Sequence, residues 1–139
     1  MSLRLDFENA LTSYLTAVSP SKPTGLNIQA GHRIDDLQVP ALIIHAESSE
    51  PIEQGLQGTT RKVSVEATVL TPVQESGTVA SHNAFFKWTE ARLRDKNAMV
   101  TAITSGMTLL GSHITGEKSS GNDQAMGDTV TAVFYIDPL

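Results

Sequence analysis

The chain has 139 residues, no cysteine and a formal net charge of −5. Residues 1–139 are expected to form a single domain, because this is an ordinary length for one. The lack of cysteine excludes disulfides, cysteine-based zinc sites and thiol nucleophiles. The acidic balance, with a pI near 5.2, argues against duplex DNA or an anionic membrane as the main ligand.

The first third of the chain predicts one helix and two strands. Apolar residues recur at spacings of three and four over 3–18, which predicts an amphipathic helix. Short strands are expected over 26–30 and 39–45, with Pro40 at the start of the second or at a sheet edge. The polar segment 47–58 is expected to be a loop or a bulged ribbon.

Residues 61–71 carry the clearest pattern, an alternation of apolar and polar residues. This alternation predicts a strand with one packed face and one solvated face. A helix is expected to begin near Ser81, a favourable N-cap, and to run to about Lys96. Its core-facing stripe is predicted to be Ala84, Phe85, Trp88 and Ala91.

The last part of the chain is rich in β-formers. Strands are expected over 99–105, 107–115 and 129–136, with a long flexible loop over 116–127. The order of elements predicts an α+β fold in which a single mixed or antiparallel β-sheet carries two helices on one face.

No constellation of residues predicts catalysis. The four histidines have no metal-ligand spacing, and Asp35-Asp36 fits a solvated turn. The chain has no nucleophile elbow, phosphate loop or dinucleotide fingerprint. We therefore expect no enzyme, no cofactor and no metal site. Since no apolar run approaches the ~18 residues of a membrane span and the N-terminus lacks a signal-peptide pattern, a soluble cytoplasmic protein is expected.

Several surface features are candidates for contact with a partner. If Trp88 faces the sheet, Phe86 and Leu93 should face outward, either into a subunit interface or under a long loop. The basic end of the same helix is either solvated or in contact with an acidic partner. The polar loop before residue 61 and the 116–127 loop are further candidates. The predicted interface set is Phe86, Leu93, Arg92, Arg94, Gln54, Leu56, Arg61, Glu117 and Lys118.

This layout resembles the tail terminator and tail completion proteins of long-tailed bacteriophages, and related minor tail and neck proteins. The resemblance covers most of the chain and is one of element order. It rests on the helix over 5–15, the strand over 40–44, the polar loop over 57–62, the strand over 63–69, the Trp88 helix and the closing strand over 131–136.

The resemblance implies a structural virion protein with no active site. Such proteins form rings, typically hexameric, that cap the tail tube, stop its polymerisation and meet the head connector or a neck protein. DNA would only pass through the lumen. With a net charge of −5 per chain, an acidic lumen wall would repel the DNA and keep it from binding. The protein would assemble in the host cytoplasm and end in the tail or neck. The alternatives are a head-completion or neck protein, and a monomeric α+β domain that binds a small ligand or a peptide.

Overall fold

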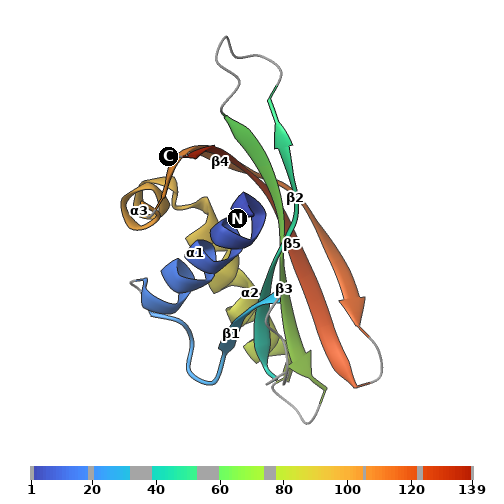
Figure 1. Cartoon of the computed structure of the whole chain (residues 1–139). Helices are drawn as coiled ribbons and strands as arrows, with labels where there is room; N and C mark the ends of the chain where they lie inside the picture. Colours follow the sequence, from blue (N-terminus) through green and yellow to red (C-terminus); the bar gives the residue numbers. More distant parts are fainter. Residues whose placement is uncertain are drawn as a thin grey trace.

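The computed structural model describes residues 2–18, 21–31, 39–52, 60–73, 78–104, 106–121 and 124–138. Figure 1 shows one twisted sheet with the helices gathered on one side of it. In chain order the elements are α1 (Leu3–Ala17), β1 (Asn27–Ala30), β2 (Ala41–Pro51), β3 (Arg61–Pro72), α2 (Thr78–Arg94), α3 (Lys96–Ala102), β4 (Met107–Gly121) and β5 (Ala125–Pro138).

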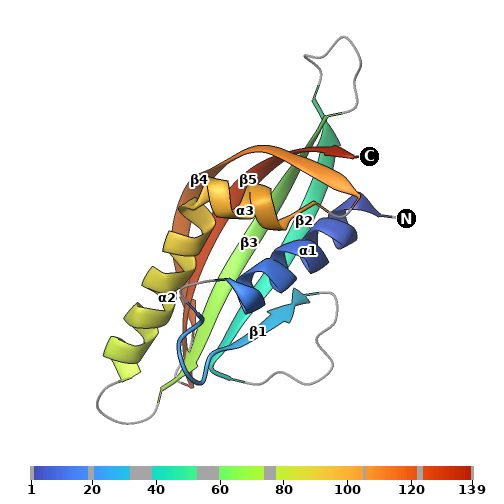
Figure 2. The same ribbon diagram turned by 90° about the vertical axis from the view of Figure 1, so that its left-hand side faces the viewer.

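The described residues form a sheet of five strands in the order β1-β2-β3-β5-β4. β1 pairs with β2 in parallel, and every other pair is antiparallel. The predicted α+β fold with a single mixed sheet is therefore confirmed. In Figure 2, α1 crosses β2 and β3, while α2 lies beside the β4 and β5 side of the sheet.

The alternation in the long central strand has the predicted consequence. On β3 every second residue from Val63 to Thr71 is buried, and the residues between them are half-buried. The buried row faces the helices, where Phe7, Leu11 and Leu15 of α1 are fully buried. Phe134 of β5 meets Phe7 with the ring centroids 4.8 Å apart. The core is thus one layer of side chains between the helices and a single sheet face.

The strand expected over 99–105 is wrong, because the chain forms a third helix there. Asp95 caps this helix by accepting a hydrogen bond from the Ala98 amide at 3.2 Å. Met99 and Ile103, four residues apart, are both buried in the core. A short apolar run bounded by polar residues fits either period, and here the aspartate cap and the four-residue spacing favour helix.

The loop expected over 116–127 is also largely wrong. Over 47–51 the bulged-ribbon alternative is confirmed, because β2 shifts register against β3 between Ala46 and Ser48, and residues 53–58 lie outside the described part of the chain. β2 continues to Pro51, and β4 and β5 pair through 116–127 as a hairpin, from Gly116 opposite Thr131 to Gly121 opposite Met126. Polar hairpins of this kind lack the apolar alternation that identifies a strand in a sequence. Figure 1 shows these two hairpins reaching beyond the helices at opposite ends of the sheet.

Gly121→Ala is expected to lower the free energy of unfolding by about 1–3 kcal/mol, because a side chain is strained at positive φ. Gly121 has φ of 127°, and an added Cβ would lie 2.5 Å from the Ala125 carbonyl oxygen. Gly116→Ala is the matched control in the same strand, since its Cβ would make only an ordinary contact at 3.5 Å. Urea unfolding measures both. Equal free energies of unfolding for the two variants would contradict the claim that a side chain at position 121 is strained.

Candidate interaction surfaces

The α2 helix does not turn the expected face to the core. Its buried residues are His82, Phe85, Thr89 and Leu93. Leu93 is 3 % exposed, so the prediction that it faces outward is wrong. Phe86 is only half-buried and packs against the rim of the core.

The predicted core stripe of α2 is wrong at both of its alanines, because Ala84 and Ala91 are exposed. The core face instead includes two polar residues, Thr89 and His82, that are not in the predicted stripe. Thr89 is fully buried because its hydroxyl donates to the Phe85 carbonyl at 2.9 Å. His82 is buried because both ring nitrogens have partners. A polar side chain whose hydrogen bonds are satisfied can be buried at little cost.

The basic end of α2 is held within the chain. The Arg92 carbonyl accepts a hydrogen bond from the Tyr14 hydroxyl at 3.0 Å, which joins α2 to α1. Arg94 is exposed, and its Nε lies 3.6 Å from Glu90 one turn earlier. Such an exposed pair contributes little to stability.

Lys118 and Glu117 point to opposite faces of the outer hairpin, as adjacent strand residues do. Lys118 Nζ lies 2.6 Å from Glu66 Oε2, on the sheet face opposite the described helices, and this ion pair connects β4 to β3. Glu117 turns towards α2, where the neighbouring Glu90 carboxyl raises the pKa of the Glu117 carboxyl.

Arg61 connects β3 to β2 at the outer end of their pairing, where it lies opposite Pro51. Its Nε donates to the Ser49 hydroxyl at 2.8 Å, and a terminal nitrogen donates to the Ser49 carbonyl at 3.0 Å. The other two predicted contacts in this region, Gln54 and Leu56, lie outside the described residues.

The uncovered face of the sheet is rich in hydroxyl groups. Thr68 of β3 and Thr129 of β5 face each other there and share a hydrogen bond of 2.9 Å. Glu47 joins the Glu66 pair on this face, and its hydrogen bond with Glu66 raises the Glu47 pKa. A sheet face of this composition tolerates water, so the helices need to cover only the other face.

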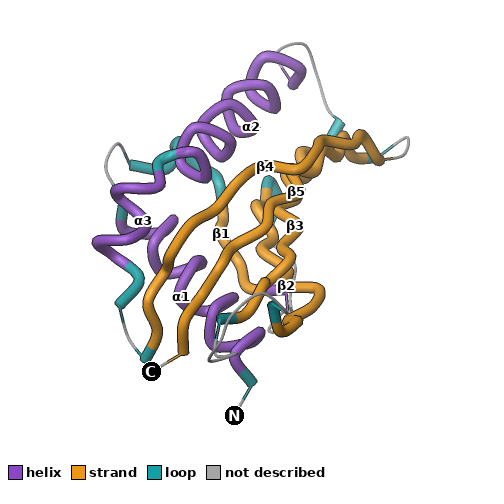
Figure 3. Tube along the Cα trace, turned by 90° about the horizontal axis from the view of Figure 1, so that it is seen from above, coloured by secondary structure: helices purple, strands orange, loops and turns teal. Residues whose placement is uncertain are grey.

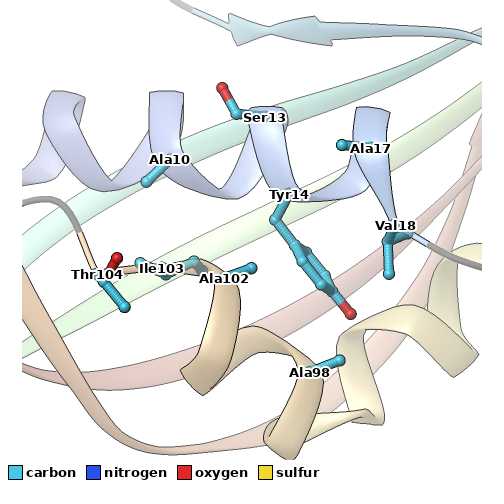
Figure 4. A pocket seen from close by; sticks show the side chains of 9 residues that line it. All are labelled: Ala10, Ser13, Tyr14, Ala17, Val18, Ala98, Ala102, Ile103 and Thr104. Carbon is cyan, nitrogen blue, oxygen red and sulfur yellow. The ribbon is translucent and has the colours of Figure 1, made fainter.

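A groove of about 400 Å³ lies between α1 and α3. Figure 4 shows the phenol of Tyr14 lying between the two helices, among small side chains. Burial raises the pKa of that phenol. The groove has the volume of a small-ligand site, but few polar groups line it to orient a ligand. Its lining is Ala10, Ser13, Tyr14, Ala17, Val18, Ala98, Ala102, Ile103 and Thr104.

A chain of hydrogen bonds joins three strands to α2. Ser119 donates to Asp128 at 2.6 Å, Asp128 lies 2.5 Å from His82 Nε2, and His82 Nδ1 lies 2.8 Å from the Thr71 hydroxyl. An acid, a histidine and a hydroxyl in this order also occur in nucleophilic hydrolases. Here Thr71 is 5 % and His82 1 % exposed.

The recess beside this chain does not reach the hydroxyl of a hydrolase-like arrangement. It has a volume of about 290 Å³ and is lined by Ser119, Ser120, Gly121, Ala125, Met126, Gly127 and Asp128, without Thr71 or His82. A nucleophile needs a space beside it for the reacting atom. The hydrogen bonds connect α2 to β3, β4 and β5. Sequence reasoning missed this arrangement because its four residues are spread from position 71 to 128.

Asp128→Ala is expected to lower the free energy of unfolding at pH 7 by about 1–3 kcal/mol, because it leaves the buried His82 without its partner. Burial alone would raise the Asp128 pKa, but hydrogen bonds from Ser119 and His82 outweigh it and lower the pKa below its usual value.

This lowered pKa gives the acid dependence a definite sign. The stabilisation by Asp128 is present above the pKa of the unfolded chain and is lost as the pH falls through the lowered, folded-state pKa. In Asp128→Ala, urea unfolding between pH 2 and 7 should show less loss of stability in acid than in the parent protein. Glu50→Gln, at an exposed carboxyl on β2, is the control. An acid limb that is unchanged by Asp128→Ala would contradict this role.

The described residues hold no group of three or more histidine or acidic side chains that could bind a metal ion. No helix among them is long and apolar enough to cross a bilayer. These two findings concern only the described part of the chain.

Comparison with known proteins shows the fold and goes no further. No protein-family model matches the sequence, and no curated protein matches it either. One solved structure aligns with all of this chain and 98 % of its own chain, at a TM-score of 0.56 and 14 % sequence identity. At this identity the likeness establishes a shared arrangement of helices and strands along the whole chain, and carries no function with it.

Proposed function

We propose that this protein is a bacteriophage tail terminator. In this proposal, copies of the chain form a ring, hexameric by resemblance, that caps the tail tube and ends its polymerisation. The ring then offers its other side to the head connector or a neck protein. The order of elements, with α1 first, β3 leading into the Trp88 helix and β5 closing the sheet, is the layout on which the resemblance rests.

The observation that carries the proposal is the pair of braced hairpins at opposite ends of a half-covered sheet (Figure 1). Arg61 stiffens one hairpin, and the Lys118–Glu66 pair stiffens the other. A terminator needs contacts in two directions along the tail axis, one to the tube and one to the head. Projections at both ends of one sheet fit that requirement.

A ring also needs two different surfaces that match each other, because a head-to-tail contact closes only when it repeats. The chain offers different surfaces at its two sheet edges, β1 and β4. It also offers different surfaces on its two sheet faces, one under helices and one open (Figure 3). The proposed role requires surfaces and no reacting groups.

The test is capping of tail tubes. Purified protein added to growing tubes is expected to bind one end of each tube and to stop its extension, as seen by negative-stain electron microscopy. Binding along the tube wall, or extension at an unchanged rate, would contradict the proposal. Binding to purified head connectors with no effect on tubes would favour the neck-protein alternative instead.

A second candidate, a monomeric binding domain, is favoured by the groove between α1 and α3. It predicts a monomer that binds a small apolar fluorescent probe, with binding lost in Ala102→Trp because the new side chain would occupy the groove. An assembled ring whose mass and capping activity survive Ala102→Trp would separate the two candidates in favour of the terminator.

A further inference from the structure

The two outer strands of the sheet, β1 and β4, each have a strand partner on one side only within the described part of the chain. β1 pairs over four residues, and β4 is fifteen residues long. The outer side of such a strand presents backbone N–H and C=O groups that can pair with another strand. Both edges are therefore candidates for contact between chains.

Two side chains of α1 form hydrogen bonds with the backbone of one residue at the edge of the sheet. Just past the end of β1, the Ala46 amide of β2 donates to Glu8 at 2.9 Å, and Arg4 donates to the Ala46 carbonyl at 2.7 Å. This replaces the missing strand bonds at that residue. Glu8 is fully buried in making this contact.

The β4 edge is treated differently. Charged side chains often guard an edge, but Lys118 is folded onto Glu66 and Glu117 is turned towards Glu90, both within the same chain. Pairing with β5 shifts register twice, between Leu109 and Gly111 and between Ile114 and Gly116, and is regular over 116–121. The end of β4 is thus a regularly paired edge whose two charged side chains point to the faces of the sheet.

The directions of β1 and β4 allow the two strands to pair antiparallel between copies. β1 runs parallel to β2, and three antiparallel pairings then lead from β2 to β4, so β1 and β4 run in opposite directions. One row across the sheet reads Asn27, Ala41, Leu70, Gly127 and Ser120. A second copy rotated about an axis along the strands would bring its β1 antiparallel to this β4, with its Asn27 level with Ser120.

We propose that the β4 edge over 116–121 binds β1 of a second copy of this chain, so that one sheet continues from subunit to subunit. This inference rests on the proposed ring and names its subunit contact. The contact joins two different edges, so it is head-to-tail. A row of copies would therefore keep adding subunits until β4 of the last copy meets β1 of the first and the ring closes. Backbone pairing supplies the recognition.

Chemical cross-linking tests the contact, because the chain has no cysteine of its own. The variants are Asn27→Cys, Ser120→Cys and the double variant, each treated with a short bis-maleimide. The double variant is expected to give a ladder of cross-linked species that ends at the ring size. Each single variant alone should stay uncross-linked, and a mixture of the two should give dimers.

Three results would overturn the inference. Dimers from Ser120→Cys alone would mean that β4 pairs with β4 about a two-fold axis. An assembled double variant that gives no ladder would mean that the ring uses another surface, and the proposed function would survive. If the parent protein is monomeric even with tail tubes present, both the inference and the proposed ring are wrong.

Adjacent proline substitutions give a second test. Neighbouring N–H groups of a strand point to opposite sides, so one of Ser119→Pro and Ser120→Pro removes a bond to β5 and the other removes an outward N–H. The outward variant should keep the melting temperature of the alanine variant at the same position and reduce the assembled fraction at least tenfold. Ser119→Ala and Ser120→Ala control for the hydroxyl groups. Full assembly of the stable proline variant would contradict the β4 contact.

Discussion

Phe134→Ala is expected to lower the free energy of unfolding by about 3–5 kcal/mol, the usual range for truncating a buried aromatic ring. Phe134 is fully buried at the middle of the core, where its ring meets Phe7 at 4.8 Å. The truncation removes apolar contact area and leaves a cavity between α1 and the sheet, which the surrounding strands can fill only in part.

The neighbouring residue provides the matched control. Tyr135 points to the sheet face opposite the helices, where its ring stacks on that of His113 with the ring centroids 5.8 Å apart. The Tyr135 side chain is half-buried. Tyr135→Ala should therefore cost about 1–2 kcal/mol, since less area leaves the protein interior. Urea denaturation followed by Trp88 fluorescence measures both variants. Equal losses for the two would mean that the helices do not define the only core face.

Leu93→Asp is expected to prevent folding, with a loss above roughly 4 kcal/mol, because it places an unpaired carboxylate in the core. Leu93 is 3 % exposed. Phe86→Asp, at the half-buried rim of the same helix, should give a folded protein with a smaller loss. Ala91→Asp, at an exposed position, should change stability by less than about 0.5 kcal/mol.

Circular dichroism and size-exclusion chromatography distinguish the three α2 variants. A folded Leu93→Asp monomer that fails to assemble would restore the sequence-based view of Leu93 as an interface residue. Loss of assembly in a folded Phe86→Asp would instead assign the rim of α2 to the subunit contact, in addition to the β4 edge.

The sequence predicted the central part of the fold because its patterns there are set by burial. On β3 one face is packed and the other is wet, so polarity and burial agree from Val63 to Thr71. The α1 helix was predicted for the same reason, since its apolar residues Phe7, Leu11 and Leu15 are spaced by four.

The prediction failed where polar residues are buried or where a strand leaves the core. Thr89 and His82 lie on the core face of α2 because hydrogen bonds within the chain satisfy them. A prediction based on apolar residues omits both, and it places the exposed Ala84 and Ala91 on the core face instead. The outer half of β4 is exposed on both faces, so its polarity was read as a loop. This half of β4 is a strand because it pairs with β5.

The predicted interface residues were chosen by residue type and position along α2 and the hairpins, and their part in assembly stays a prediction. Arg61 and Lys118 make side-chain contacts within the chain, and the Arg92 carbonyl accepts a hydrogen bond from Tyr14. The β4 edge, which we propose as a subunit contact, could not be identified from sequence, because the order of strands in a sheet depends on long-range pairing. Topology, and not residue type, distinguishes it.

The central claim is that this chain assembles into a closed ring, and the most direct test is its mass in solution. Native mass spectrometry and light scattering across a range of concentrations should find a discrete species of about six subunits of 14.9 kDa each. It should form alone or in the presence of tail tubes. A protein that stays monomeric at every concentration, with and without tubes, would contradict the account.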